Sequence, residues 1–252
     1  QTKRALFQGE IDLLAVEVGN PLKLQQLTTA VRRRFPQLTL YNVDVPLALR
    51  FCAAYDLFPL CYAHLHQEAG TIITLSAKEN RWHRKPSAPP LRTLIIEPED
   101  DPTQTAPNAI MVADDRGRRR IPLAPAGLLL KQLNIILRRF DPDLILTRFG
   151  DSWLFPLLQR LAEQTGIPFH PSRDEKRPFL RRAARTIHSY GHVEHRHAQY
   201  HLYGRWHIDR RNSMMFGDYK VAGIIEQARV TGMPILEVAR KSPGAGISAF
   251  PI

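Results

Sequence analysis

The stretch Asp141–Leu158, DPDLILTRFGDSWLFPLL, decides the fold because it leads from a strand through a tight turn into a helix. Leu144–Thr147 is a short apolar run typical of a buried strand. Asp151 or Ser152 is placed to cap the helix that follows. This helix is predicted to have an apolar face formed by Leu154, Leu157, Leu158 and Leu161, at positions i, i+3, i+4 and i+7. This turn would aim Leu154 back at the end of the strand, where a leucine can do no chemistry.

Strands and helices alternate on both sides of this corner, which predicts an α/β (α+β) fold with a mixed sheet flanked by helices. Helices are predicted over Pro21–Phe35, Val45–Tyr55, Gly127–Phe140 and Ser152–Gln164. Strands are predicted over Glu10–Glu17, Leu38–Val43, Thr71–Leu75, Leu91–Glu97, Ala109–Ala113, Arg119–Leu123 and Leu144–Thr147, with a hairpin turn at Gly117. The proline-rich stretch Arg81–Pro90 (RWHRKPSAPP) is expected to separate a domain over residues 1–90 from one over residues 91–252.

The composition is that of a folded protein rather than a disordered or membrane-spanning one. Hydrophobic residues make up 44% of the 252 residues, enough for a packed core. No apolar run approaches the ~20 residues that cross a bilayer, and the N-terminus QTKRALFQGE lacks the layout of a signal peptide. Cys52 and Cys61 fit two incidental thiols of a cytoplasmic protein, although a disulfide between them stays open. Because the chain starts at Gln1, we expect an upstream portion to be trimmed or left out.

The positive charge of the chain is concentrated in one segment. The formal net charge is +11. Pro171–Arg211 holds ten Lys or Arg residues against four acids, which leaves +6 on this segment. Such a concentration of positive charge favours binding to a polyanion, because each phosphate contact releases counterions. A solvated basic face that only keeps the protein soluble would give the same pattern of charge. The candidate nucleic-acid contacts are Arg177, Arg181, Arg182, Arg185, Arg196, Arg205, Arg210 and Arg211, with Tyr190 and Trp206 as rings for base stacking.

The opening stretch, together with several others, resembles a known family. DPDLILTRFGDSWLFPLL is similar to the second motif of the 3′–5′ exonuclease domain in family B DNA polymerases. LYNVDVPLALRFCAAYDLFPL (Leu40–Leu60) resembles their N-terminal domain, and LRTLIIEPED falls where the first exonuclease motif should lie. GRWHID (Gly204–Asp209) resembles a later strand, and Ala222–Phe250 resembles the segment leading toward the palm. The resemblance implies a ribonuclease-H-like exonuclease domain after a smaller N-terminal β/α domain.

The same resemblance implies a metal site that has lost most of its ligands. Such exonucleases hold two divalent cations with four carboxylates. Glu97 and Glu99 occupy the acidic positions of the first motif, but Leu154 stands where the second motif has its aspartate, and Phe149 stands at its asparagine. The third motif, Tyr-x3-Asp, is absent from the sequence. We therefore expect an inactive site, with Glu97 and Glu99 either in a solvated acidic turn or as weak ligands of one Mg²⁺ or Mn²⁺ ion.

A histidine-rich segment gives a second, less specific metal candidate. It contains His188, His192, His195, His197, His201 and His207. Histidine nitrogens are frequent ligands of zinc, but no cysteine or regular ligand spacing accompanies these residues, and the segment alternates like a hairpin. Packing within a hairpin is the expected role, and no cofactor is predicted.

The sequence therefore predicts a DNA-binding and scaffolding portion of a family B DNA polymerase, present in the cytoplasm and associated with the nucleoid. Its partners would be single-stranded or primer–template DNA and a polymerase core, in cis or in trans. The palm that carries nucleotidyl transfer in this family is not in the chain, so we expect no DNA synthesis by this chain alone. Two alternatives stay open. One is a residual metal-dependent 3′–5′ exonuclease, and the other is a protein-interaction scaffold without DNA contact.

Overall fold

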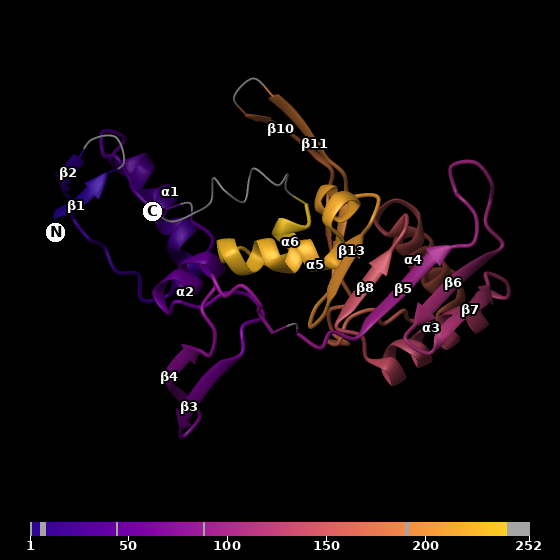
Figure 1. Ribbon diagram of the computed structural model, residues 1–252. Helices are drawn as coiled ribbons and strands as arrows, with labels where there is room; N and C mark the ends of the chain where they lie inside the picture. The colour runs from indigo at the N-terminus through magenta and orange to yellow at the C-terminus, as the bar shows by residue number, and fades with distance from the viewer. Residues whose placement is uncertain (1, 6–8, 44, 88, 190–191, 241–252) are drawn as a thin grey trace. The chain divides into compact units, whose positions relative to one another are not determined.

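The computed structural model describes residues 2–5, 9–43, 45–87, 89–189 and 192–240, with the backbone alone at 4–5, 185, 187–189 and 192–196. The chain divides into two compact units, Gln1–Ala54 and Tyr55–Ile252. The boundary expected near residue 90 falls inside the second unit and stays a prediction. Figure 1 shows the order of the elements along the chain. No helix of the described part is long and apolar enough to cross a membrane.

The first unit combines one small hairpin with two helices. Strands β1 (Thr2–Ala5) and β2 (Gly9–Asp12) pair antiparallel. The turn η1 (Pro21–Lys23) leads into α1 (Leu24–Arg34), and α2 (Leu47–Ala54) follows. Apolar spacing predicts both helices, and η1 starts at the proline because its missing N–H costs nothing in a first turn.

One predicted strand of the first unit is wrong. Residues 38–43 form no strand in the structure, and Asn42 has a left-handed backbone with φ 56°. The Asn42 carbonyl instead accepts a hydrogen bond from Arg50 Nη2 at 2.7 Å. An apolar run becomes a strand only when a partner strand takes up its N–H and C=O groups, and the described residues supply none at this position.

The second unit begins with a hairpin and continues into a five-stranded sheet. β3 (Ala63–Glu68) and β4 (Thr71–Ala77) form the hairpin. The sheet has the strand order β13-β8-β5-β6-β7. Its strands are β5 (Thr93–Pro98), β6 (Ala109–Asp114), β7 (Gly117–Pro122), β8 (Leu144–Thr147) and β13 (Trp206–Asp209). β5, β8 and β13 run parallel, whereas β5, β6 and β7 run antiparallel with the turn at Gly117, as expected.

Helices cover both faces of this sheet, and alternate residues of β5 and β8 enter two different cores. On one face, Leu94, Ile96 and Ile145 pack with α3 (Ala126–Phe140) and α4 (Phe155–Thr165). On the other face, Leu144 and Leu146 pack with α5 (Met214–Thr231) and α6 (Ile235–Val238). The prediction of a mixed sheet flanked by helices is confirmed.

Four short strands follow α4 before the chain returns to the sheet. β9 (Leu180–Arg182) pairs with β12 (Gln199–His201), and β10 (Arg185–Ser189) pairs with β11 (His192–Arg196). The hairpin expected for the histidine-rich segment is therefore present. Tyr200 of β12 packs in the core with residues of the central sheet.

The turn after β8 differs from its expected form. Phe149 has a left-handed backbone (φ 62°), and Gly150–Leu154 form one π-helical turn, η2, before α4 begins. The prediction that Asp151 or Ser152 caps the helix is wrong, because neither side chain bonds an N–H group at its start. Asp151 is buried at 5% exposure and its carboxylate serves other partners. Gly166 ends α4 in the left-handed conformation, as expected.

Gly150→Ala should lower the free energy of unfolding by about 1–3 kcal/mol, the usual cost of forcing an extra carbon into a packed site. A Cβ at this position would lie 1.9 Å from Thr147 Oγ1 and 2.7 Å from His207 Nε2, so the turn or the strand ends must move. Urea unfolding followed by tryptophan fluorescence measures the change.

Gly217→Ala is the matched control, because a Cβ there meets no atom within 4 Å. Gly217 lies in α5, where alanine favours the helix by up to about 1 kcal/mol. We expect this variant to be as stable as the parent or slightly more stable. Equal stability of the parent and Gly150→Ala would show that the turn does not approach the strand ends this closely.

Candidate functional site

The carboxyl ends of β5, β8 and β13 meet at one edge of the sheet, because the three strands are parallel and neighbouring. Ligands of open α/β sheets bind at this edge. Glu97 lies near the end of β5, Thr147 ends β8, and Asp209 ends β13. The sequence-predicted metal site therefore falls where the fold would place it, and the partners of each side chain decide what the site can bind.

Glu97 is held between two arginines from different strands. Arg118 of β7 donates from Nη2 to Oε1 at 3.1 Å, and Arg210, just beyond β13, donates to Oε2. The Glu97 side chain is only 20% exposed. Both carboxylate oxygens are therefore engaged by positive groups, which a metal ion would have to displace.

Glu99 and Asp101 are engaged in the same way. Arg120 donates to the two oxygens of Glu99 from Nε at 2.6 Å and Nη2 at 2.8 Å, a bidentate pair. This hydrogen bonding lowers the pKa of Glu99. Asp101 accepts from Thr103 Oγ1 at 2.6 Å and from Arg148 Nη2 at 3.3 Å. Glu99 is thus neither a free ligand nor part of a freely solvated acidic turn.

Leu154 is part of the core rather than part of a pocket. It is 1% exposed and packs in the core that contains Ile96 and Ile145, on the face covered by α3 and α4. Glu97 follows Ile96 on the strand, so its side chain points to the opposite face of the sheet. A carboxylate at the position of Leu154 would therefore sit in apolar surroundings.

Phe149 has a buried ring that is flanked by two cations. Its side chain is 4% exposed. The guanidinium carbons of Arg148 and Arg211 lie 5.2 and 4.9 Å from the ring centroid, within the range of cation–π attraction. The edge thus gathers an arginine cluster, which consists of Arg118, Arg120, Arg148, Arg210 and Arg211.

A buried polar network beneath this edge was not predicted from the sequence. His207 is fully buried, and burial lowers its pKa, so the ring is neutral. Its Nδ1 lies 2.8 Å from the Tyr200 carbonyl, which can only accept, so Nδ1 carries the hydrogen. Nε2 then accepts from the Thr147 hydroxyl at 2.8 Å. Both ring nitrogens of His207 are thereby used to join β8, β12 and β13.

The two buried carboxylates of this network also have structural partners. Asp151 accepts from the Tyr200 N–H at 2.7 Å and from Asn212 Nδ2 at 2.8 Å. Asp209 accepts from the N–H groups of Asp151 at 2.9 Å and Arg211 at 3.0 Å, while burial raises its pKa. Within the residues that the structure describes, no three His, Cys, Asp or Glu side chains are placed to hold a metal ion.

The described residues of the predicted nucleic-acid set do not form one surface. Arg181 and Arg182 are exposed on β9. Arg210 and Arg211 join the arginine cluster, and Arg177 bonds Asp174 at 2.6 Å with its guanidinium 4.4 Å from the Tyr203 ring. Arg205 is buried, and Trp206 packs against the core between the sheet and α5. The side chains of Arg185 and Arg196, and the whole of Tyr190, lie outside the described residues. The DNA-binding role of the set stays a prediction.

A groove of about 840 Å³ adjoins β9 and β12, and it adds a basic residue that sequence reasoning missed. Arg182, His197 and His201 line it together with Arg240 from beyond α6. Burial and the nearby Arg240 lower the pKa of His201 to about 4, so the ring is neutral at pH 7. Its Nε2 lies 2.6 Å from Arg240 Nη1 and accepts that hydrogen bond. The side chains of His188, His192 and His195 lie outside the described residues.

Leu154→Asp should destabilise the protein by about 3–5 kcal/mol, because it buries a carboxylate without a partner. Mn²⁺ at millimolar concentration should leave the melting temperature of this variant unchanged, since Glu97 faces the other side of the sheet. Leu154→Ala is the control for lost packing alone, expected to cost about 2–5 kcal/mol. If Mn²⁺ raised the melting temperature of Leu154→Asp by several degrees and left that of Leu154→Ala unchanged, the two carboxylates at positions 97 and 154 would be close enough to share a metal ion.

Comparisons with known proteins agree with this fold. No protein-family model matches the chain. Over 59 residues, or 23% of the chain, it is 36% identical to DNA polymerase 1 of Pyrococcus abyssi, and the match spans 8% of that protein. The solved family B DNA polymerase from the hyperthermophilic archaeon Pyrobaculum calidifontis is similar with a TM-score of 0.59 at 16% identity. That similarity covers 91% of the chain and 38% of the polymerase, so the chain spans about two fifths of this relative. The chain therefore has the fold of part of a family B DNA polymerase.

Proposed function

We propose that this chain binds DNA without hydrolysing it and serves as a scaffold for a polymerase core. The observation that supports the proposal is the state of the two acids left from the first motif. Glu97 and Glu99 are both bonded to arginines, and the position of the next ligand is a core leucine. A two-metal mechanism needs carboxylates that face the ions, and Mg²⁺ tolerates little departure from octahedral geometry.

The arginine cluster is suited to bind the phosphates that metal ions would otherwise contact. Five guanidinium groups face the four carboxylates of Glu97, Glu99, Asp100 and Asp101, so five minus four leaves one positive charge at this edge. Within the described residues, the buried Nε of Arg210 has no hydrogen-bond partner. A planar guanidinium matches phosphate geometry. DNA would then be held by direct ion pairs.

The exposed arginines of β9 and the neighbouring groove add further positive charge that could bind phosphate. Arg182 belongs to both, and Arg240 reaches the groove from beyond α6. Exposed arginines contribute to nucleic-acid affinity mainly through counterion release, which makes the affinity depend strongly on salt. We propose that the partner core lies in cis or in trans, in line with the 38% of the solved polymerase that the chain covers.

Charge reversal at Arg181 and Arg182 should weaken binding to single-stranded DNA and flatten its salt dependence. Each lost phosphate contact should reduce the slope of log K against log[salt] by roughly 0.7. Fluorescence anisotropy with a labelled oligonucleotide, at 50 to 300 mM KCl, provides the measurement.

Lys131→Glu/Arg139→Glu is the matched control, because both residues are exposed on α3 and carry the same total charge change. We expect its slope to equal that of the parent. Weak binding of the parent with almost no salt dependence would favour the protein-interaction scaffold over a DNA-binding role.

Glu97→Gln separates DNA binding from a residual exonuclease. The change removes one negative charge and frees Arg118 and Arg210, so DNA affinity at low salt should rise by a few-fold, as for a gain of about 1 kcal/mol. Neither the parent nor the variant should trim 3′ ends with Mg²⁺ or Mn²⁺ at high protein concentration. Metal-dependent trimming by the parent that disappears in Glu97→Gln would establish the nuclease instead.

A further inference from the structure

A cavity of about 190 Å³ lies at the edge of the sheet opposite the arginine cluster. The parallel strands begin there. Arg92 precedes β5, Asp143 precedes β8, and Arg205 precedes β13. The cavity itself is lined by Asn134, Leu137, Arg138, Asp141, His170, Ser172, Arg173, Glu175 and Arg205. Every residue of this site belongs to the second unit.

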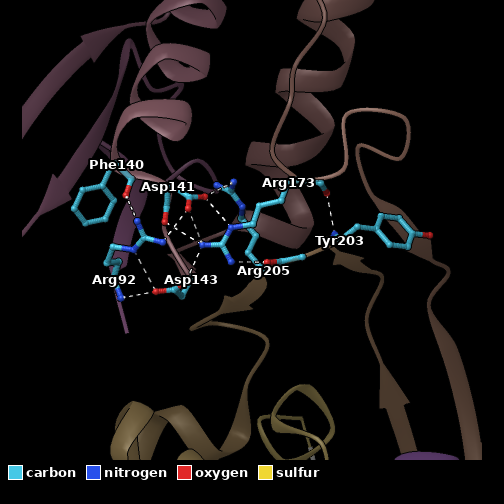
Figure 2. Close-up of polar contacts among 9 residues, drawn as sticks. Arg92, Phe140, Asp141, Asp143, Arg173, Tyr203 and Arg205 are labelled. Atoms are coloured by element: carbon cyan, nitrogen blue, oxygen red, sulfur yellow. Dashed lines mark hydrogen bonds and ion pairs between the residues drawn. The ribbon is translucent and has the colours of Figure 1, made fainter. Parts of the chain in front are cut away.

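An ion-pair network forms one wall of the cavity, and Figure 2 shows its members converging. Arg173 donates from Nε to Asp141 at 2.7 Å and from Nη2 to Asp143 at 2.7 Å. Arg92 donates to Asp141 at 2.9 Å and to Asp143 through its backbone N–H at 2.9 Å. Burial raises the pKa of Asp143, but hydrogen bonds from Arg173 and Arg92 lower it to about 2. The same contacts lower the pKa of Asp141, so both acids are ionised at neutral pH.

Gly204 holds Arg173 in this arrangement. Its backbone is left-handed (φ 76°), and a Cβ would lie 2.8 Å from the Cβ of Arg173. Its carbonyl accepts a hydrogen bond from Arg173 Nη1 at 2.7 Å. The residue after it is Arg205, so the glycine also fixes where Arg205 enters the network. The wall is therefore built by the fold rather than assembled from mobile surface side chains.

Arg205 is the member whose charge is not balanced. Its side chain is 4% exposed, and its Nη2 lies 3.3 Å from an Asp141 carboxylate that Arg92 and Arg173 already engage. Three guanidinium groups face two carboxylates, so three minus two leaves one positive charge. In the described part of the chain, Nε and Nη1 of Arg205 are buried without a hydrogen-bond partner. A buried cation in this state costs several kcal/mol unless a counter-charge reaches it.

His170 adds a second unsatisfied polar atom on the cavity wall. Its Nδ1 is buried, and no hydrogen-bond partner for it is found among the described residues. The backbone N–H of His170 donates to Asn134 Oδ1 at 3.0 Å, which fixes the main chain of His170 next to the cavity. At the rim, Arg138 is 79% exposed and lies 3.8 Å from Glu175, a balanced and loosely held pair.

We propose that this cavity binds an oxyanion of the phosphate class, with Arg205 as its buried cationic ligand. His170 would contribute a ring nitrogen, and Arg138 would close the rim. A tetrahedral oxyanion can accept hydrogen bonds from several directions at once, as these donors require. The volume admits one such group but falls below the 300–1,000 Å³ typical of sites for larger organic ligands. Free phosphate and a terminal phosphate of nucleic acid share this chemistry.

Inorganic phosphate titrated into the full chain, at constant ionic strength against chloride, tests the proposal. Calorimetry should detect one site per chain. Arg205→Lys should weaken binding about tenfold or more, because a point charge replaces a multi-donor group. Arg138→Ala, at an exposed position that should not disturb folding, should weaken binding a few-fold even if Arg205→Lys fails to fold. Arg139→Ala, an exposed neighbour outside the cavity, should bind like the parent.

Three results would overturn the proposal. One is the absence of saturable phosphate binding up to tens of millimolar. Another is binding that Arg205→Lys, folded as judged by circular dichroism, and Arg138→Ala leave unchanged. A crystal structure grown in phosphate with an ordered water beside Arg205, rather than the anion, would do the same.

Oligonucleotides with a 5′-phosphate or a 5′-hydroxyl identify the source of the group. A preference for the phosphorylated end that Arg138→Ala removes would assign the site to nucleic-acid ends. Phosphate binding without that preference would assign it to the free anion. The titration contains no DNA, so phosphate binding by Arg181→Glu/Arg182→Glu would support this site even if the proposed DNA-binding surface failed its own test.

Discussion

The hydrogen bond from Thr147 to the fully buried ring of His207 is the interaction on which the second unit depends. This hydrogen bond joins β8 to β13 beneath the turn that follows β8. Gly150 of that turn lies against the two bonded side chains, where the Cβ of any other residue would clash with them. Since β5, β8 and β13 are parallel, fixing this register also fixes both ends of the strands. One edge then carries the arginine cluster, and the other carries the network around Arg205.

The chemistry of the carboxyl edge follows from which charges face each other. A site that binds two divalent cations concentrates carboxylates and leaves them unpaired until the metal arrives. In this chain the carboxylates of Glu97 and Glu99 have arginines as counter-charges, and those arginines outnumber them. The edge therefore has the sign of charge that attracts phosphate rather than cations. This pairing of the acids with arginines, more than the leucine at position 154, is the physical basis of the proposed binding role.

The two ends of the parallel strands differ in how far their arginines are exposed and in how completely the charges of these arginines are balanced. At the carboxyl edge, Arg118 and Arg120 are about half exposed, and their pairs with Glu97 and Glu99 are open to exchange with a polyanion, whereas Arg210 is 28% exposed. At the amino edge, Arg205 is almost completely buried, and Asp141 is shared among three arginines. A surface of the first kind responds to salt, whereas a site of the second kind selects an ion by size and by the number of hydrogen bonds it accepts.

β13 was expected only from the resemblance of Gly204–Asp209 to a strand of the family, and α5 and α6 were not predicted. Periodicity was sufficient for α1 to α4 and for β5 to β8, because their apolar residues recur at the spacing that one buried face requires. It failed at Leu38–Val43, where no partner strand is present among the described residues, and at Asp151, whose carboxylate bonds Tyr200 and Asn212 instead of a helix end. That Leu154 stands at a carboxylate position of the exonuclease motif stays an expectation from the resemblance, whereas the burial of this side chain in the core is observed.

The sequence could not show that Glu97 meets Arg118 and Arg210, or that Arg205 is buried with its charge unbalanced. These pairs join residues more than twenty positions apart, and their strength depends on burial and on which neighbours share each carboxylate. By itself, the sequence determined the class of the fold, the basic character of the chain and its likeness to a polymerase region. Only the tertiary structure decided which charges are paired, since that depends on strand order and on the face of the sheet to which each side chain points.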